Sequence, residues 1–327
     1  MIYIPDIPLI DFAAQQAARD RLQALEHPNE MLNALAIRVA TIRGELDVQL
    51  VQKRVVLIGA DSGHTAVDPA ETVQRMQETV DGKAEICAIA QQHQATITLT
   101  DVGMTQPFTH PSVQSLRIAK GGNMAAGSAL VITEVNDAFM VGMNIGSLEI
   151  SNGMNLLAAG AITSRGGTLS AIAVAAVLGQ IPVAEIMPES DPFALNLTIP
   201  AQIELIEHAI KLNNPEKIDV IDVIRTVGSA EIATIAGLML VAAAGRVPVI
   251  IDGLISAAAA YTAASLNPAM RFTLIAGKAP IHPAHSFILQ KLGLRPLIEL
   301  ETTDQAAVGA ASAFATVDAA TQLLADK

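Results

Sequence analysis

Two polar motifs in this 327-residue sequence combine residue types that could do chemistry. Asp61-Ser62-Gly63-His64 follows an apolar run, and an aspartate close to a histidine can work as an acid–base pair. The alternative is that Asp61 forms a turn or caps a helix. Glu231 follows Gly228-Ser229, where it is a second candidate acid or simply complements the dipole of a helix that begins there.

The stretch from Gly160 to Thr168 is rich in glycine and hydroxyl side chains, and an alanine-rich segment follows it. The pattern predicts a strand from Leu156, a turn over residues 163–168 and a helix from about Leu169. Backbone N–H groups at the start of such a helix attract anions, so the turn is a candidate phosphate cradle. The same glycines would also suit close packing of helix on sheet, and spacing alone does not decide between the two interpretations.

Metal and dinucleotide chemistry have little support. His282 and His285 are three residues apart, but Pro283 lies between them and no carboxylate is close in sequence. The single cysteine, Cys87, excludes an internal disulfide and a cysteine metal cage. No Gly-x-Gly-x-x-Gly motif opens a helix, and no Walker-type lysine follows a glycine loop. The sequence therefore predicts no metal and no cofactor.

The charge balance argues against nucleic acid as a partner. Acidic residues number 32 against 20 basic ones, the net charge is −12, and no basic run could neutralise a phosphate backbone. Residues 166–184 carry no charge over roughly the length of a membrane span, but their Ala- and Gly-rich composition favours a buried helix. The N-terminus lacks the basic start and continuous apolar core of a signal peptide. We expect a cytoplasmic protein without membrane contact.

Alternating strand and helix patterns must position these motifs. The clearest strands are Lys53–Ala60, Thr96–Val102 and Val247–Ile251. The alternation predicts one parallel sheet covered on both faces, a Rossmann-like three-layer α/β domain over residues 46–327. Two predicted helices in residues 1–45 form an appended helical subdomain or dimer arm, and residues 103–127 are expected to form a long loop. Asp61 and Asp252 would lie at the carboxyl ends of strands, where such sheets bind ligands.

Five segments together resemble the CobT-type family of nicotinate mononucleotide:dimethylbenzimidazole phosphoribosyltransferases. They are VVLIGADSGH, ITLTDVG, GMNLLAAGAI with its glycine turn, VGSAEIATIAGLML and RVPVIIDGLISAAAA, and the resemblance spans nearly the whole chain. It implies the fold of that family, with a domain over residues 46–327 that is similar to a phosphoribosyltransferase. The residues that it marks as vestigial nucleotide- or phosphate-binding candidates are Asp61, Gly160, Ser164, Gly166, Gly167, Thr168, Glu231 and Asp252.

The chain departs from the family pattern at two acidic positions. Where the family has Gly-Glu-x-Gly-Ile-Gly-Asn-Thr-Thr, Ala161 replaces the glutamate and Arg165 replaces a glycine. Ala306 replaces the glutamate of the family's Leu-Gly-Glu-Gly-Thr-Gly-Ala, the proposed general base. Alanine cannot accept a proton, and loss of a positioned base lowers a rate by about 10² to 10⁴. The resemblance therefore implies a chain without a catalytic base of its own.

The family includes a paired arrangement, the ArsA/ArsB heterodimer that attaches ribosyl phosphate to phenol or p-cresol, and the chain resembles the ArsB-type subunit. On this hypothesis a paralogous catalytic subunit binds most of the nicotinate mononucleotide and of the phenolic or benzimidazole base. Two alternatives remain open. One is an active phosphoribosyltransferase with its base relocated to Asp61, Glu231 or Asp304, and the other is a regulatory protein that binds nucleotide at the glycine turn.

Overall fold

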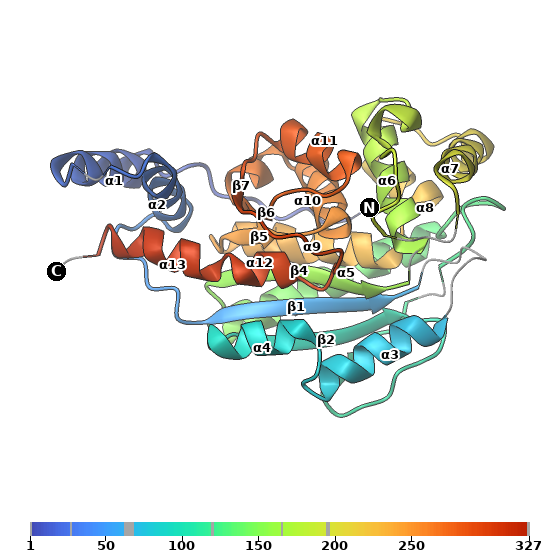
Figure 1. The fold of residues 1–327 in the computed structure, drawn as a ribbon, viewed down its shortest axis with the longest axis horizontal. Coiled ribbons are helices and arrows are strands. Elements are labelled where there is room, and N and C mark those ends of the chain that lie inside the picture. Colours follow the sequence, from blue (N-terminus) through green and yellow to red (C-terminus); the bar gives the residue numbers. More distant parts are fainter. Residues whose placement is uncertain are drawn as a thin grey trace.

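The computed structural model describes residues 2–26, 28–61, 69–118, 121–164, 166–193 and 197–325, with the backbone alone of residue 69. Its centre is a parallel sheet of seven strands in the order β3-β2-β1-β4-β5-β6-β7 (Figure 1). The strands are β1 (Lys53–Ala60), β2 (Thr96–Gly103), β3 (Val113–Ser115), β4 (Leu156–Thr163), β5 (Val249–Ile251), β6 (Leu274–Lys278) and β7 (Pro296–Ile298). The chain order reverses between β1 and β4, as in doubly wound α/β folds. The predicted fold class is confirmed.

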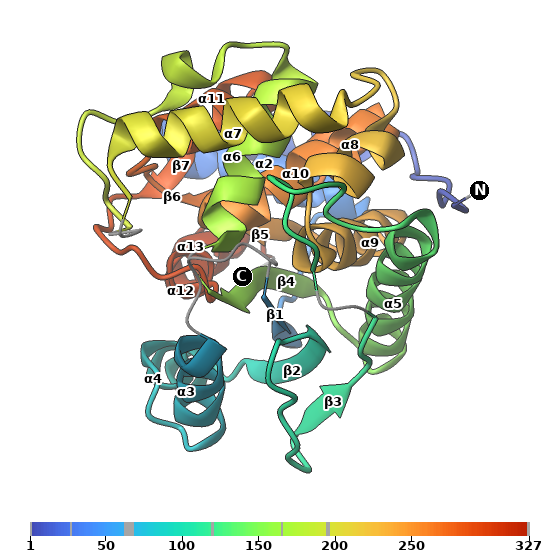
Figure 2. The same ribbon diagram turned by 90° about the vertical axis from the view of Figure 1, so that its right-hand side faces the viewer.

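Helices cover both faces of this sheet and complete the three layers (Figure 2). One face carries α5 (Ile132–Ser151), α6 (Gly166–Gly179), α7 (Ile199–Asn213), α8 (Val220–Val227), α9 (Ala230–Ala244), α10 (Leu254–Leu266) and α11 (Pro283–Leu292). The other carries α1 (Phe12–Ala24), α2 (Glu30–Arg43), α3 (Pro69–Val80), α4 (Glu85–Gln92), α12 (Val308–Ser312) and α13 (Phe314–Gln322). In β4, Leu157 and Ala159 join the first core and Leu156 and Ala158 the second. A strand buried on both sides needs such a continuous apolar run.

Two glycines set the distance between α5 and α9, the helix pair behind β1, β2 and β4. A Cβ on Gly142 would lie 1.9 Å from the carbonyl oxygen of Thr234, and a Cβ on Gly237 would lie 2.3 Å from that of Phe139. Neither space can hold a methyl group unless the helices move apart. This close packing fixes α9, and with it Glu231 at the start of that helix.

The N-terminal helices pack on the second core. α2 contacts α13, and Leu22 of α1 and Val39 of α2 belong to the same apolar cluster as Val55 of β1. Side-chain caps begin both helices: Asp11 accepts a hydrogen bond from the N–H of Ala14 at 2.9 Å, and Asn29 caps α2 in the same way. The division into residues 1–45 and 46–327 stays a prediction.

The charge-free segment forms α6, in which every residue from Gly166 to Val177 is buried. It packs against α10, α8 and α7. Among the described residues, no helix combines the length and the apolar character that crossing a membrane requires.

Three predicted boundaries are wrong. β4 runs through Gly160 to Thr163, and α6 begins at Gly166 rather than near Leu169, because neighbouring elements bury this segment from all sides. The long loop over residues 103–127 contains β3, which pairs with β2. β5 begins at Val249 rather than at the predicted Val247.

Candidate ligand-binding site

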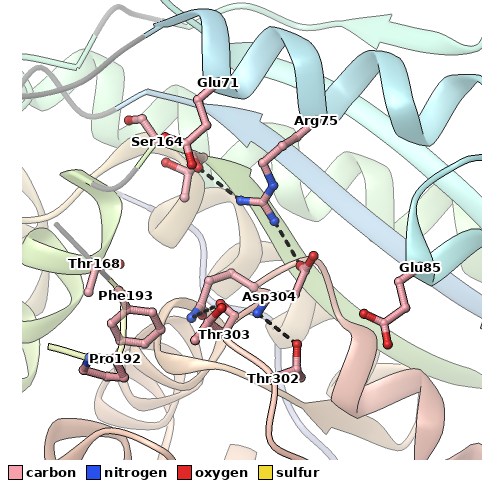
Figure 3. Close-up of a pocket in the computed structure, with 12 residues that line it drawn as sticks. Glu71, Arg75, Glu85, Ser164, Thr168, Pro192, Phe193, Thr302, Thr303 and Asp304 are labelled. Atoms are coloured by element: carbon pink, nitrogen blue, oxygen red, sulfur yellow. Dashed lines mark hydrogen bonds and ion pairs between the residues drawn. The ribbon is translucent and has the colours of Figure 1, made fainter.

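A cavity of about 510 Å³ lies at the carboxyl end of β4, beside the point where the strand order reverses. Ligands of open α/β sheets bind at this position, and the volume falls within the range of about 300–1,000 Å³ for small-molecule sites. The lining comes from α3, α4, the β4–α6 turn, residues 192–193 and the segment before α12 (Figure 3). The lining residues are Glu71, Arg75, Glu85, Thr163, Ser164, Thr168, Pro192, Phe193, Thr302, Thr303, Asp304 and Gln305.

The β4–α6 turn supplies two of the predicted site residues. Ser164 and Thr168 line the cavity, while Gly166 and Gly167 lie in the first turn of α6 and do not. The carbonyl oxygen of Ser164 accepts a hydrogen bond from the N–H of Gly167 at 3.1 Å. Ser164 is 1% exposed, and its Oγ has no hydrogen-bond partner among the described residues. A buried hydroxyl without a partner is unfavourable, so this one is available to a bound molecule. Arg165, in the same turn, lies outside the described residues.

Gly160 is not part of the turn. It lies inside β4, where a Cβ would lie 2.4 Å from the backbone nitrogen of Ala307 and 2.7 Å from the carbonyl oxygen of Gln305. The N–H of Ala161 donates to that same carbonyl oxygen at 2.9 Å. Gly160 therefore serves close passage of one backbone over another, not contact with a ligand.

Glu231 lies directly behind the cavity wall. It is fully buried, its Oε1 is 3.5 Å from the Oγ1 of Thr163, and a Cβ on Gly167 would lie 2.9 Å from the same oxygen. Its Oε2 has no hydrogen-bond partner among the described residues. Burial, with a smaller contribution from the nearby charge of Asp61, raises the pKa of Glu231 to about 7. A carboxylate thus already occupies the space beside the start of α6, where an anion would otherwise be attracted.

Asp61 links two elements and does not line the cavity. Its carboxylate accepts hydrogen bonds from the Oγ1 of Thr72 at 2.6 Å and from the N–H of Thr105 at 2.8 Å. These bonds hold α3 and the segment after β2 beside the end of β1. His64, its predicted acid–base partner, lies outside the described residues, so that pairing stays a prediction.

Asp252 contacts the first turn of α12. It follows β5, is fully buried and accepts a hydrogen bond from the N–H of Gly309 at 3.0 Å. Burial raises the pKa of Asp252 to about 7 and lowers the pKa of its neighbour Lys278. The Nζ of Lys278 donates to the carbonyl oxygen of Thr302 at 2.5 Å. Asp252 therefore holds the start of α12 and does not itself line the cavity.

The loop over residues 302–307 closes one side of the cavity (Figure 3). Arg75 forms an ion pair with Asp304 at 3.0 Å and donates to the carbonyl oxygen of Thr163 at 3.4 Å. The Oε1 of Gln305 accepts from the N–H of Ile255 at 3.3 Å, at the start of α10, whose N-cap Gly253 has no side chain to do so. Polar side chains of this loop are thus engaged in contacts within the protein.

Ala306 borders a second cavity, of about 160 Å³, which Arg75, Glu85 and Asp304 also line. The methyl group belongs to the second core and is 4% exposed, whereas Ala161 belongs to the first core and is fully buried. The backbones of these two positions meet through the hydrogen bond between Ala161 and Gln305, although 145 residues separate 161 from 306. Their side chains lie on opposite faces of the sheet.

Phe193 forms an aromatic part of the wall. Its ring stacks on His282 with a centroid distance of 5.6 Å and an interplanar angle of 28°. The Nδ1 of His282 accepts from the N–H of Ala284 at the start of α11, and burial lowers its pKa to about 4. Burial also lowers the pKa of His285 to about 3. In the described ranges no three His, Cys, Asp or Glu side chains are grouped so that they could hold a metal ion.

Several lining residues had no signal in the sequence. Arg75, Glu71 and Glu85 lie on ordinary-looking amphipathic helices, and Thr302 and Thr303 lie in a polar turn after the last strand. Charged residues on helix surfaces are mostly solvated, so their type and spacing do not distinguish these. Only the folding of α3 and α4 over the end of β4 brings them to the cavity.

Fold and cavity define a doubly wound α/β protein with a small-molecule site at the reversal of its strand order. A family model described as "Phosphoribosyltransferase" matches residues 7–327, and the chain belongs to this family. The resemblance to CobT-type proteins is thereby confirmed at the level of the family.

Individual relatives and a solved structure agree with this family assignment. The nicotinate-nucleotide–dimethylbenzimidazole phosphoribosyltransferase of Chloroflexus aggregans is 34% identical over 327 residues, covering 97% of this chain and 92% of the relative. The protein of the same name from Halalkalibacterium halodurans is 33% identical over 309 residues, covering 91% of this chain and 85% of the relative. The crystal structure of CobT from Thermus thermophilus matches with a TM-score of 0.88 and 26% identity, covering 95% of this chain and 96% of that one.

Proposed function

We propose that this chain is the catalytically silent subunit of a heterodimeric phosphoribosyltransferase that makes the α-ribotide lower ligand of cobamides. A paralogous catalytic subunit would bind most of the nicotinate mononucleotide and transfer ribosyl phosphate to a phenolic or benzimidazole base. The observation that carries this proposal is Ala306, which lies in the loop at the cavity and borders an empty space of about 160 Å³. The resemblance puts the catalytic glutamate of the family at that position.

The charges around Ala306 support the same conclusion. The nearest carboxylate in sequence, Asp304, is paired with Arg75 and also accepts from the N–H of Ala306 through the same Oδ1. Asp61 is held by Thr72 and Thr105, and Glu231 is buried behind Thr163 without lining the cavity. A phenol, with a pKa of about 10, needs a base to deprotonate it, and on this proposal the paralogous subunit supplies that base.

The test is coexpression with a paralogue that retains the glutamate, followed by native mass measurement and turnover assays. We expect a 1:1 complex that forms the α-ribotide and an isolated chain that does not. Substituting the paralogue's glutamate should abolish turnover of the complex. An isolated chain that converted nicotinate mononucleotide at an ordinary enzyme rate would contradict the proposal, and so would the absence of a complex.

Asp304 supports a second candidate, an active enzyme with a relocated base. Of Asp61, Glu231 and Asp304, it alone has its side chain in the lining of the cavity. On this hypothesis the isolated chain has turnover and Asp304→Asn removes it. If the isolated chain is inactive before any substitution, this candidate is wrong.

A further inference from the structure

One ion pair lies between the larger cavity and the smaller space beside Ala306. The cavities of about 510 Å³ and about 160 Å³ share three lining residues, Arg75, Glu85 and Asp304. The Nη2 of Arg75 lies 3.0 Å from the Oδ1 of Asp304. Figure 3 shows Arg75 reaching from α3 to Asp304, with Phe193 on one side of the pair and Glu85 on the other. The paired side chains therefore form part of the boundary between the two spaces.

The backbones on both sides of this boundary are held in place. Arg75 lies within α3, where its carbonyl oxygen accepts a hydrogen bond from the Oγ1 of Thr79 at 2.8 Å. Asp304 precedes Gln305, which is buried and whose carbonyl oxygen accepts from the N–H of Ala161 at 2.9 Å. Opening of the boundary therefore needs the rotation of a side chain and no movement of either backbone.

The ion pair itself is weak. Its side chains are 25% exposed for Arg75 and 31% for Asp304, and ion pairs of this exposure shift an equilibrium by a factor of about five or less. The other hydrogen bond of the guanidinium, to the carbonyl oxygen of Thr163, is long at 3.4 Å. Rotation of Arg75 alone breaks both contacts, while Asp304 keeps its hydrogen bond to the N–H of Ala306. The pair can therefore separate at little cost to the fold.

The space beyond the pair has room for part of a ligand. Small or aliphatic side chains form one part of its wall, namely those of Ala84, Ile86, Ile162 and Ala306, and the rest of the wall is polar or charged. A cavity of about 150 Å³ can hold a molecule the size of benzene. A molecule in the larger cavity thus gains a ring-sized space when the pair opens.

We infer that the ion pair between Arg75 and Asp304 is a gate between the two cavities. When the pair is closed, it separates the larger cavity from the space beside Ala306. When the pair is open, the two spaces join and admit a ring-sized part of a ligand that is bound in the larger cavity. This inference goes beyond the proposed function, because it concerns passage between two spaces within this chain and requires neither turnover nor a partner subunit.

The experiment measures passage through the gate with flexible crosslinkers. In a Cys87→Ser background, Thr168→Cys places one thiol at the larger cavity and Ala306→Cys places another at the smaller one. Thr168 and Ala306 are each 4% exposed, so a short bis-methanethiosulfonate must join the two thiols through the interior. The crosslinking rate is divided by the rate of the first modification, because the charges near a thiol also change its reactivity.

Asp304→Asn and Arg75→Gln each break the pair in this two-thiol parent. We expect each to raise the normalised crosslinking rate about two- to fivefold, which corresponds to about 0.4–1 kcal/mol, and the double variant to be no faster than the single ones. Raising the NaCl concentration from about 0.02 M to about 0.5 M should speed crosslinking in the parent and not in Asp304→Asn. Asp222→Asn breaks an ion pair of similar exposure with Arg225 on α8, and as the control it should leave the rate unchanged.

A crosslinking rate that does not rise in both pair variants would overturn the inference, and so would the absence of crosslinking at every spacer length. Unfolding midpoints show whether each variant is folded, and Phe193→Cys, at another lining position of the larger cavity, replaces Thr168→Cys if that variant does not fold.

The result is independent of the heterodimer. A 1:1 complex formed by a chain whose ion pair is no gate would refute only the inference about the gate. A chain with a working gate that forms no complex would refute only the proposed function.

Discussion

The α5–α9 pair and the loop over residues 302–307 differ in how strongly packing restricts their amino-acid sequence. In the helix pair, each glycine touches the backbone of the opposite helix, so nearly any substitution would force the helices apart. In the loop, the resemblance sets Asp304, Gln305 and Ala306 where the family pattern has Leu-Gly-Glu, and side-chain contacts of Asp304 and Gln305 hold the loop in place. The difference shows that packing constrains the scaffold, whereas side chains that face a cavity can change while the fold stays intact.

The largest effect should come from the scaffold. Gly142→Ala places a methyl group 1.9 Å from the carbonyl oxygen of Thr234, so the free energy of unfolding should fall by about 3 kcal/mol or more. Urea denaturation measures this change in the free energy of unfolding. Gly127→Ala is the control, because no atom lies within 4 Å of a Cβ there. Equal stability of the two variants would mean that α5 and α9 do not pack as described.

Glu231 lies in the first turn of α9, and its substitution should change how the free energy of unfolding depends on pH. Burial raises the pKa of Glu231 from 4.5 to about 7, so the folded protein keeps a proton that the unfolded chain has lost in that window. Stability from this group is greatest below pH 4.5 and falls by up to about 3 kcal/mol as the pH rises through about 7. Between pH 5 and pH 8, the free energy of unfolding of Glu231→Gln should therefore rise relative to that of the unsubstituted chain. Denaturant unfolding at a series of pH values measures this difference. A constant difference between the two proteins would show that Glu231 is not buried in this way.

Gln305 tests whether the loop has acquired a structural role. Its Oε1 accepts from the N–H of Ile255 at the start of α10, so Gln305→Ala should lower the free energy of unfolding by about 1 kcal/mol. The exposed Gln290 on α11 provides the control, and Gln290→Ala should change stability much less. Guanidinium denaturation measures the free energies of unfolding of the two variants. If they were equally stable, the bond to Ile255 would contribute nothing.

Asp304→Asn should have the smallest effect. Its ion pair with Arg75 is partly solvated, with side-chain exposures of 25% for Arg75 and 31% for Asp304, so stability should fall by no more than about 1 kcal/mol. If the catalytic base belongs to a partner subunit, as proposed, turnover of the heterodimer should be unchanged within about twofold. A hundredfold loss of turnover would instead assign the base to this chain and erase the contrast between scaffold and loop.

Much of the site's framework could be predicted from the sequence. Apolar runs and helical periods predicted the parallel sheet and the helices on both faces, because each period reports which side of an element is buried. The sequence predicted a polar turn after β4, and two of its predicted residues, Ser164 and Thr168, line the cavity. The start of α6 and the place of Gly160 were wrong, because tertiary burial extended both elements beyond what local propensity indicates.

By itself, the amino-acid sequence determined the fold class, the family and the absence of an acid at positions 161 and 306, since these depend on residue type and period. Only the tertiary structure decided which charges surround the cavity. Arg75 and Asp304 are 229 residues apart, and no local pattern relates them. Their pairing, and the burial of Glu231 behind Thr163, depend on long-range packing of α3, α9 and the final loop against the end of β4.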